Sequence, residues 1–278
     1  MPPLAGRRIA LLESRKSEEL SALVRRLGGI AISAPSVREV PRHDDADTFV
    51  TALTSRPVAV AVFLTGVGAT ALLDDADRRG QLPAVLAGLR QITVACRGPK
   101  PLGVMRRVGV TPAVVTAKPH TTRELLDALT PIELRGTGVL VAHYGERSDE
   151  LPAALRERGA EVVEVCPYEW ALPDDVGPLA TLVRDTIAGH VDAMLFTSQI
   201  QCRHLFAVAT ELGCAAPLAE ALNRDVVVGA VGPVCAQAIR DAGITPDVIP
   251  ESPNMASLIA AVADYFELTD SPVRGPDL

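Results

Sequence analysis

Aromatic side chains are scarce in this sequence, with one Trp, three Tyr and five Phe among 278 residues. Lysine is scarcer still, because only Lys16, Lys100 and Lys118 accompany the 24 arginines. Acidic residues outnumber basic ones and give a formal net charge of −7. A chain without aromatic stacking platforms and without a basic excess is not expected to bind nucleic acid directly. Its core must be aliphatic, and an apolar content of 48% is typical of a globular protein.

Paired cysteines and long apolar runs are also missing. The five cysteines include no CxxC pair, which excludes a regular disulfide framework and favours reduced thiols in the cytoplasm. The longest apolar run, Val58–Leu64, is far shorter than the ~20 residues of a membrane span, and the N-terminal residues lack the apolar stretch of a signal peptide. The histidines show no metal-ligand spacing. We therefore expect a soluble cytoplasmic protein with no membrane partner and no metal.

The chain repeats itself. Gly98-Pro99, Arg106 and Gly109 to Pro112 reappear 134 residues later as Gly232-Pro233, Arg240 and Gly243 to Pro246. Ser17 to Leu20 with Gly28 reappear, offset by 131, as Ser148 to Leu151 with Gly159. Phe63 to Gly66 also resembles Phe196 to Ser198. Apolar segments of strand length alternate with amphipathic helical segments, which predicts parallel sheets and two copies of one α/β unit.

The copies can be arranged in line, dividing near residue 134, or the chain can leave the first domain, build the second and return. The extended, proline-bearing stretches 35–42 and 164–173 favour the return, because they read as two connecting strands. The predicted fold class is α/β, with two similar flavodoxin-like, three-layer domains of parallel sheet joined by a two-stranded linker, the first domain being discontinuous. The predicted boundaries are 1–38 with 173–268 for domain 1, 42–168 for domain 2, and 269–278 for a disordered tail or linker.

Small or hydroxyl-bearing residues repeatedly follow the predicted strands and precede helices. Each one alone is explained by helix capping, but in parallel sheets all of them gather at the carboxyl edges, where helix N-termini attract anions. Arg15, Lys16 and Arg147 follow the matching first strands of the two copies, where they are either solvated loop charges or ligand contacts. Together they predict a polyanionic ligand, with the substrate-binding candidates Arg15, Lys16, Thr65, Gly66, Gly98, Lys100, Arg147, Thr197, Ser198, Gly232 and Val234.

A nicotinamide cofactor is the alternative suggested by Gly66 to Ala71, which match GxGxxA after a strand. That site would need an acidic residue at the end of the next strand to hold the ribose, and the sequence there is Ala95-Cys96-Arg97. We therefore interpret the small residues as a tight strand-to-helix turn and expect no cofactor.

In order and spacing, several stretches resemble the uroporphyrinogen-III synthase family over roughly residues 6–267. These stretches are Phe196 to Ser198, Ala230 to Pro233 with its helix to Gly243, Glu251 to Pro253, and Asp149 to Gly159 followed by Val165 to Tyr168. The resemblance implies a monomer whose two domains bind a linear tetrapyrrole, hydroxymethylbilane, in the cleft between them. It also implies closure to uroporphyrinogen III, with inversion of ring D and loss of water, and no cofactor.

By the same resemblance, Tyr168 is the catalytic residue that protonates the departing hydroxyl, and Ser198 is the serine of the cleft. Three positions depart from the family pattern, since Gly66, Pro101 and the pair Val234-Cys235 stand where it favours hydroxyl side chains. The alternative function is a catalytically weak, synthase-like domain that senses a tetrapyrrole or another small anion, for example within a regulator.

Overall fold

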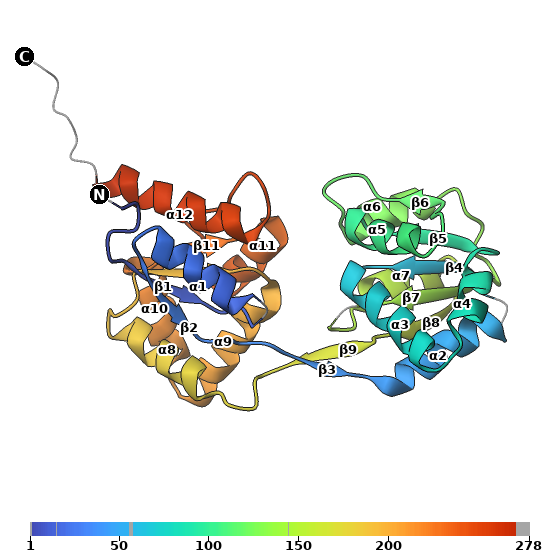
Figure 1. Cartoon of the computed structure of the whole chain (residues 1–278), viewed down its shortest axis with the longest axis horizontal. Helices are drawn as coiled ribbons and strands as arrows, with labels where there is room; N and C mark the ends of the chain where they lie inside the picture. The colour runs from blue at the N-terminus through green and yellow to red at the C-terminus, as the bar shows by residue number, and fades with distance from the viewer. Residues whose placement is uncertain (1, 15, 56–57, 144, 271–278) are drawn as a thin grey trace, which may run out of the picture. The chain divides into compact units, whose positions relative to one another are not determined.

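The computed structural model describes residues 2–14, 16–55, 58–143 and 145–270. The chain divides into two compact units, Met1–Arg38 with Ala171–Leu278 (unit 1) and Glu39–Trp170 (unit 2). Strands β3 (Arg38–Pro41) and β9 (Tyr168–Ala171) pair as a two-stranded sheet where the chain passes from one unit to the other (Figure 1). Unit 1 is therefore discontinuous, as predicted.

Unit 1 is built on a four-stranded parallel sheet in the order β11-β10-β1-β2. Its strands are β1 (Arg8–Leu11), β2 (Ile30–Ser33), β10 (Ala193–Phe196) and β11 (Val227–Ala230). Val248 continues the sheet through an isolated parallel bridge with Gly229. Because β1 and β10 are mainly apolar and buried, they form the centre of the sheet, as expected for parallel strands covered on both faces.

Helices cover both faces of this sheet (Figure 1). One face packs against α8 (Gly177–Ile187), α9 (Gln199–Glu211), α10 (Ala215–Arg224) and α11 (Pro233–Asp241). The other packs against α1 (Ser17–Arg26) and α12 (Met255–Asp270). The two clusters are largely aliphatic, with Phe196 in one and Phe266 in the other.

Unit 2 contains a five-stranded parallel sheet in the order β6-β5-β4-β7-β8. Its strands are β4 (Val58–Phe63), β5 (Thr93–Cys96), β6 (Val114–Val115), β7 (Gly138–Ala142) and β8 (Glu161–Val165). One face packs against α2 (His43–Thr54), α3 (Gly66–Arg78), α4 (Leu82–Leu89) and α5 (Pro99–Arg107). The other packs against α6 (Thr122–Leu129) and α7 (Glu150–Glu157).

The two units have the same order of elements, but they start at different points. From α8, unit 1 runs β10, α9, α10, β11, α11 and α12, and it is completed by β1, α1 and β2 from the N-terminal part of the chain. Unit 2 runs from α2 through β4 to β8 without interruption. The repeat offset of 131 residues therefore relates unit 2 to the N-terminal piece of unit 1, and the offset of 134 residues relates unit 2 to the C-terminal piece. The predicted fold class, two similar three-layer α/β domains with a two-stranded linker, is confirmed.

Several elements were not predicted. The alternation of apolar and amphipathic segments in the sequence did not identify β2 or α2, for example. Strand β2 lies at the edge of its sheet and is partly exposed, so it lacks a buried apolar run. Helix α2 begins with acidic residues, which read as a loop. Helix α12 continues to Asp270, so residues 269–270, assigned to the tail, are helical, while 271–278 lie outside the described residues. Over the described ranges, no helix combines the length and the apolar character that crossing a bilayer requires.

Two helical glycines provide a matched test of the packing in unit 2. A Cβ on Gly88 of α4 would lie 2.5 Å from the Leu53 carbonyl oxygen of α2, whereas a Cβ on Gly103 of α5 would meet nothing within 4 Å. Gly88→Ala is expected to lower the free energy of unfolding by about 1–3 kcal/mol, because α4 must move away from α2. Gly103→Ala is expected to raise it by about 0.5–1 kcal/mol. Urea unfolding of both variants checks this, and equal effects would contradict the packing described.

Candidate functional site

In unit 1, the carboxyl ends of β1 and β10 are adjacent, and the helices that follow them leave on opposite faces of the sheet. This arrangement is a topological switch point. It leaves a crevice at the carboxyl edge of the sheet, where open α/β sheets bind ligands. Glu13 and Lys16 follow β1 there, and Thr197 and Ser198 follow β10. Of the predicted candidates of unit 1, Lys16, Thr197 and Ser198 lie at this point, whereas Gly232 and Val234 follow the neighbouring strand β11. Arg15 lies outside the described residues.

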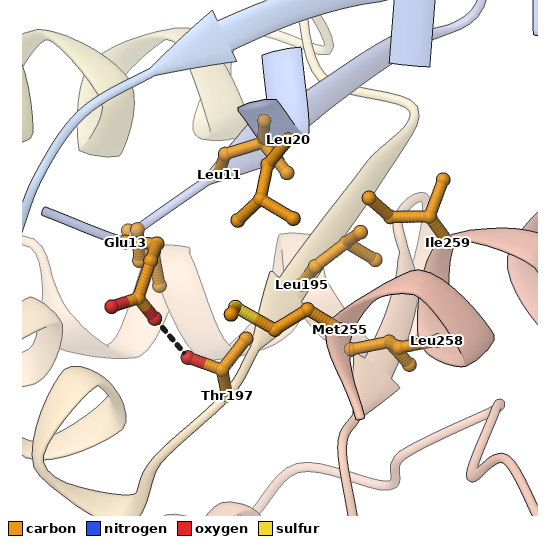
Figure 2. Close-up of a pocket in the computed structure, with 9 residues that line it drawn as sticks. Leu11, Glu13, Leu20, Leu195, Thr197, Met255, Leu258 and Ile259 are labelled. Atoms are coloured by element: carbon orange, nitrogen blue, oxygen red, sulfur yellow. Dashed lines mark hydrogen bonds between the residues drawn. The ribbon is translucent and has the colours of Figure 1, made fainter. Parts of the chain in front are cut away.

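Glu13 is the residue of this crevice that the sequence analysis missed. The Thr197 hydroxyl donates a hydrogen bond to Glu13 Oε2, as Figure 2 shows, and Gln201 Nε2 donates to the same oxygen at 3.1 Å. Gln201 Oε1 in turn accepts from the Thr197 N–H at 2.7 Å. The predicted Thr197 hydroxyl is thus engaged within the protein. Beside Glu13 lies a small, mainly apolar cavity of about 10 Å³, the space that about one water molecule needs.

The helix N-termini of unit 1 differ in whether a side chain caps their backbone N–H groups. Ser198 and Gln201 form a capping box at the start of α9. At the start of α11, Gly232 has no side chain with which to cap, and Val234 is 56% exposed. Lys16 precedes α1 in a left-handed conformation, and its ammonium group pairs with Glu19 at 3.1 Å. Of these three helices, α1 and α11 begin without a hydrogen bond from a capping side chain.

In unit 2, the candidates around α3 and α5 are in contact. Thr65 caps α3 by accepting a hydrogen bond from the Gly68 N–H at 3.0 Å. A Cβ on Gly66 would lie 3.1 Å from the carbonyl group of Lys100. Glycine at position 66 therefore allows α5 to approach α3 closely, which is a structural reason for the missing hydroxyl side chain.

The loops after β5 and β6 also touch. Gly98, with φ of 101°, precedes α5, and a Cβ there would lie 3.3 Å from the His120 ring. His120 Nδ1 lies 3.0 Å from the Thr116 hydroxyl, which ties the loop after β6 to the end of that strand. The structure thus gathers Thr65, Gly66, Gly98 and Lys100 at one edge of unit 2, together with residues 116–120, which the sequence analysis did not select.

Arg147, predicted as a substrate-binding residue, forms an ion pair within the protein. Its Nη2 donates to Asp45 Oδ2 at 2.6 Å, and the same oxygen accepts from the Cys166 N–H at 2.8 Å. Asp45 is 9% exposed. A carboxylate that bridges a guanidinium group and a backbone N–H fixes the chain locally. Through Asp45, Arg147 therefore helps to fix the position of Cys166, two residues before Tyr168.

Tyr168 begins β9 and is 6% exposed. The residues on either side of it are fastened to unit 2. Arg42 N–H donates to the Pro167 carbonyl at 2.9 Å, and Trp170 N–H donates to the Gly145 carbonyl at 2.8 Å. Gly145, with φ of 62°, leaves room for the Trp170 ring, which a Cβ would approach to 2.2 Å. Tyr168 thus lies in a segment whose neighbouring residues are hydrogen-bonded within unit 2.

His143 follows β7 and is 1% exposed. Its Nε2 lies 3.0 Å from Glu164 Oε2, and its Nδ1 has no hydrogen-bond partner in the described part of the chain. Burial lowers the pKa of His143, and this effect outweighs the opposite one of Glu164. The described residues include no group of three or more His, Cys, Asp or Glu side chains that could hold a metal ion.

These features define a two-domain α/β protein in which each copy of one unit presents a carboxyl edge lined by helix N-termini. A sequence model of the family described as uroporphyrinogen-III synthase HemD matches residues 18–260. The chain belongs to this family.

Two solved structures and one curated relative are similar along nearly the whole chain. The Thermus thermophilus uroporphyrinogen III synthase (a selenomethionine mutant form) has a TM-score of 0.78 at 27% identity, over 95% of this chain and all of that one. The Helicobacter pylori 26695 uroporphyrinogen-III synthetase has a TM-score of 0.56 at 14% identity, over 93% and 99% of the two chains, a likeness of fold alone. The Bacillus subtilis (strain 168) protein named "Uncharacterized protein YjjA" is 34% identical over 95% of this chain and 97% of its own length.

The buried His143 predicts an acid-dependent loss of stability. Because its pKa is lower in the folded than in the unfolded protein, the unfolded state takes up a proton first as the pH falls below about 6.5. Stability is therefore fully present above that pH and declines below it. We expect the wild type to lose more unfolding free energy between pH 7.5 and 5.5 than His143→Gln does. Chemical unfolding at both pH values measures this. His190→Gln, at an exposed site, should behave as the wild type, and an equal loss in His143→Gln would contradict the assignment.

Proposed function

We propose that this protein is a uroporphyrinogen-III synthase, which closes hydroxymethylbilane to uroporphyrinogen III with inversion of ring D and loss of water. The observation that carries the proposal is the family match over residues 18–260. The structural likeness to the Thermus thermophilus synthase along 95% of the chain supports it.

The proposed chemistry requires that hydroxide leave the linear substrate. Its departure produces an azafulvene cation, which the terminal ring attacks through a spiro intermediate. A proton donor beside the hydroxyl group lets it leave as water, and general acid catalysis of this kind contributes typically 10²–10⁴-fold. The reaction as proposed uses no cofactor and no metal.

Tyr168 is the proposed acid. A phenol can donate a hydrogen bond without ionising at neutral pH. The low exposure of Tyr168 and the bonds that fix Cys166, Pro167 and Trp170 support this role, since a catalytic group must be held in position. In this proposal Arg147 and Asp45 are positioning residues for Tyr168.

The carboxyl edges are proposed to bind the eight carboxylates of the substrate. A carboxylate near a helix N-terminus gains typically 0.3–1 kcal/mol, so eight contacts give about 2–8 kcal/mol, close to the ~8 kcal/mol of micromolar binding. Backbone donors can therefore hold a polyanion on a protein whose own net charge is −7. The proposed contacts are those at Lys16, Thr65, Gly66, Gly98, Lys100, Thr197, Ser198, Gly232 and Val234.

A catalytically weak, tetrapyrrole-sensing domain is the second candidate. It is favoured by the three positions without the hydroxyl groups of the family pattern. Pro101 and Cys235 are both buried. The Cys235 thiol contacts the Phe196 carbonyl oxygen at 3.5 Å, and burial raises its pKa to about 12. These side chains are not replacements for an exposed hydroxyl.

Product analysis separates the two candidates. The full chain is incubated with hydroxymethylbilane, and the products are oxidised and resolved as isomers. A synthase gives isomer III in excess of isomer I, which forms spontaneously. Isomer I alone, at the spontaneous rate, would reject the enzyme and favour the sensing domain.

Tyr168→Phe removes the proposed proton donor and retains the ring. We expect the rate of isomer III formation to fall about 10–100-fold with the thermal stability little changed, because the acid contributes to the transition state. Tyr265→Phe in α12 is the matched control and should retain the rate of the wild type. An unchanged rate in Tyr168→Phe would remove Tyr168 from the mechanism.

A further inference from the structure

Glu13 is a partly buried carboxylate whose charge is not balanced by the described residues. Its Oε2 atom accepts hydrogen bonds from the Thr197 hydroxyl and from Gln201 Nε2, and both of these donors are neutral. In the described ranges Glu13 forms no ion pair, and the ammonium group of Lys16 pairs with Glu19 instead, at 3.1 Å. Placing a carboxylate partly out of water without a cation is unfavourable. A ligand that brings a positive charge or an N–H group would satisfy it.

The two hydrogen bonds orient this carboxylate and leave one of its oxygens open. Both converge on Oε2, and Oε1 has no hydrogen-bond partner among the residues that the structure describes. Gln201 is 2% exposed, and its own Oε1 atom accepts from the Thr197 N–H at 2.7 Å, which fixes the two donors relative to each other. Figure 2 shows the Glu13 carboxylate directed at Thr197. The group is thus held in position before any ligand binds.

Glu13 lies where an α/β sheet binds its ligand. It is the second residue after β1, and Thr197 is the first after β10, so their hydrogen bond spans the two strands that form the switch point of unit 1. The small cavity beside it is lined by Glu13 together with apolar residues of α1 and α12. The carboxylate is therefore at the ligand-binding edge of the sheet, against an apolar wall.

The second copy shows that the fold does not need this network. Helices α3 and α9 begin at matching places, each with a hydroxyl side chain as its N-cap. The residues of unit 2 that match Thr197 and Gln201 are therefore Leu64 and Gly68, which have no side chain that donates a hydrogen bond. Strand β4 nevertheless pairs with β7 as β10 pairs with β1. Since the frame forms without these side chains, their presence in unit 1 favours a role toward a ligand.

The proposed substrate has groups that such an acceptor recognises. On each pyrrole ring the acidic side chains and the N–H lie on opposite sides, so helix N-termini can bind the former while a carboxylate accepts from the latter. When hydroxide leaves, the azafulvene carries a positive charge that is delocalised onto the ring nitrogen. A fixed carboxylate stabilises this cation more than it stabilises the neutral ring. Such a difference between the ground state and the transition state accelerates a reaction.

We propose that Glu13 is a second catalytic residue, whose Oε1 atom accepts a hydrogen bond from the N–H of the ring that becomes the azafulvene and balances its positive charge. Gln201, and Thr197 in addition to the contact proposed above for it, orient the carboxylate as positioning residues. Glu13 neither gives nor takes a proton in this step, because the hydroxide leaves with the proton of Tyr168. The inference rests on the proposed function for the identity of the cation.

Glu13→Gln removes the charge and retains the shape of the side chain and a hydrogen-bond acceptor. We expect kcat for isomer III to fall about 10–100-fold with KM unchanged or lower, because the charge acts on the cation and not on the bound substrate. A purely structural role predicts lower thermal stability instead, and a role in substrate binding predicts a higher KM. The control, Glu18→Gln, removes the same charge from an exposed position in the first turn of α1 and should retain the kcat of the wild type.

Two substrate analogues test the charge without turnover. One is a bilane with an aminomethyl group, an ammonium ion at neutral pH, in place of the hydroxymethyl group, and the other carries a methyl group there. All acidic side chains are retained, so the two differ in charge at the reacting carbon. Anaerobic calorimetric titration into the full chain gives both affinities. We expect the wild type and Glu18→Gln to bind the ammonium analogue about tenfold more tightly than the methyl analogue, and Glu13→Gln to bind both equally.

An unchanged kcat in Glu13→Gln, or an equal fall in Glu18→Gln, would overturn the inference, the second outcome because it reports net charge alone. Equal affinity of the wild type for the two analogues would also overturn it, and this result does not depend on the folding of any variant. Failure of the proposed function is a separate outcome. A wild type that forms only isomer I, yet prefers the ammonium analogue through Glu13, would reject the synthase and retain Glu13 as the group that recognises positive charge. Formation of isomer III with an unchanged kcat in Glu13→Gln would do the reverse.

Discussion

Unit 1 depends on the pairing of β1 with β10, two strands separated by most of the chain. Ile9, Ala10 and Leu11 align with Ala193, Met194 and Leu195, and Asp192 accepts hydrogen bonds from the Arg8 backbone at 2.6 Å and from its guanidinium group. This pairing joins the N-terminal piece of unit 1 to the remainder. It also makes the switch point, because the helices after the two strands leave on opposite faces. Glu13 and Thr197 meet as a consequence of it.

The two copies show how one frame carries different chemistry. Parallel pairing fixes where each strand ends, and the following helix begins at nearly the same place in both units. The residues at those places have diverged. Unit 1 has an internal carboxylate network, Glu13 with Thr197 and Gln201, whereas unit 2 has Lys100 and Lys118 beside a helix start that has lost backbone donors to proline. The two copies thus share their strand order, but they differ in the charged side chains at the strand ends.

Much of the fold could be predicted because it depends on local pattern. Buried strands such as β4 and β10 are continuous apolar runs, and the glycines and prolines that follow them mark the turns. Elements without such a pattern were missed, among them the edge strand β2 and the acidic start of α2. Of the candidate site, the backbone positions were found, since they are turn signals. Arg147 was selected because it follows a predicted strand, but its pairing with Asp45 was missed, since the two residues are 102 positions apart and no local pattern predicts that pair.

The sequence by itself determined that the chain contains two copies of one α/β unit, that it resembles the uroporphyrinogen-III synthase family, and which strand ends lie at the carboxyl edges. Periodicity and repeat spacing are properties of neighbouring residues, so they can be read without coordinates. Only the tertiary structure decided which side chains bond to one another. Glu13 accepts a hydrogen bond from Thr197, Asp45 forms an ion pair with Arg147, and Lys100 and Lys118 have no carboxylate partner among the described residues. Such pairs are set by strand order and helix packing, which join residues far apart in the chain.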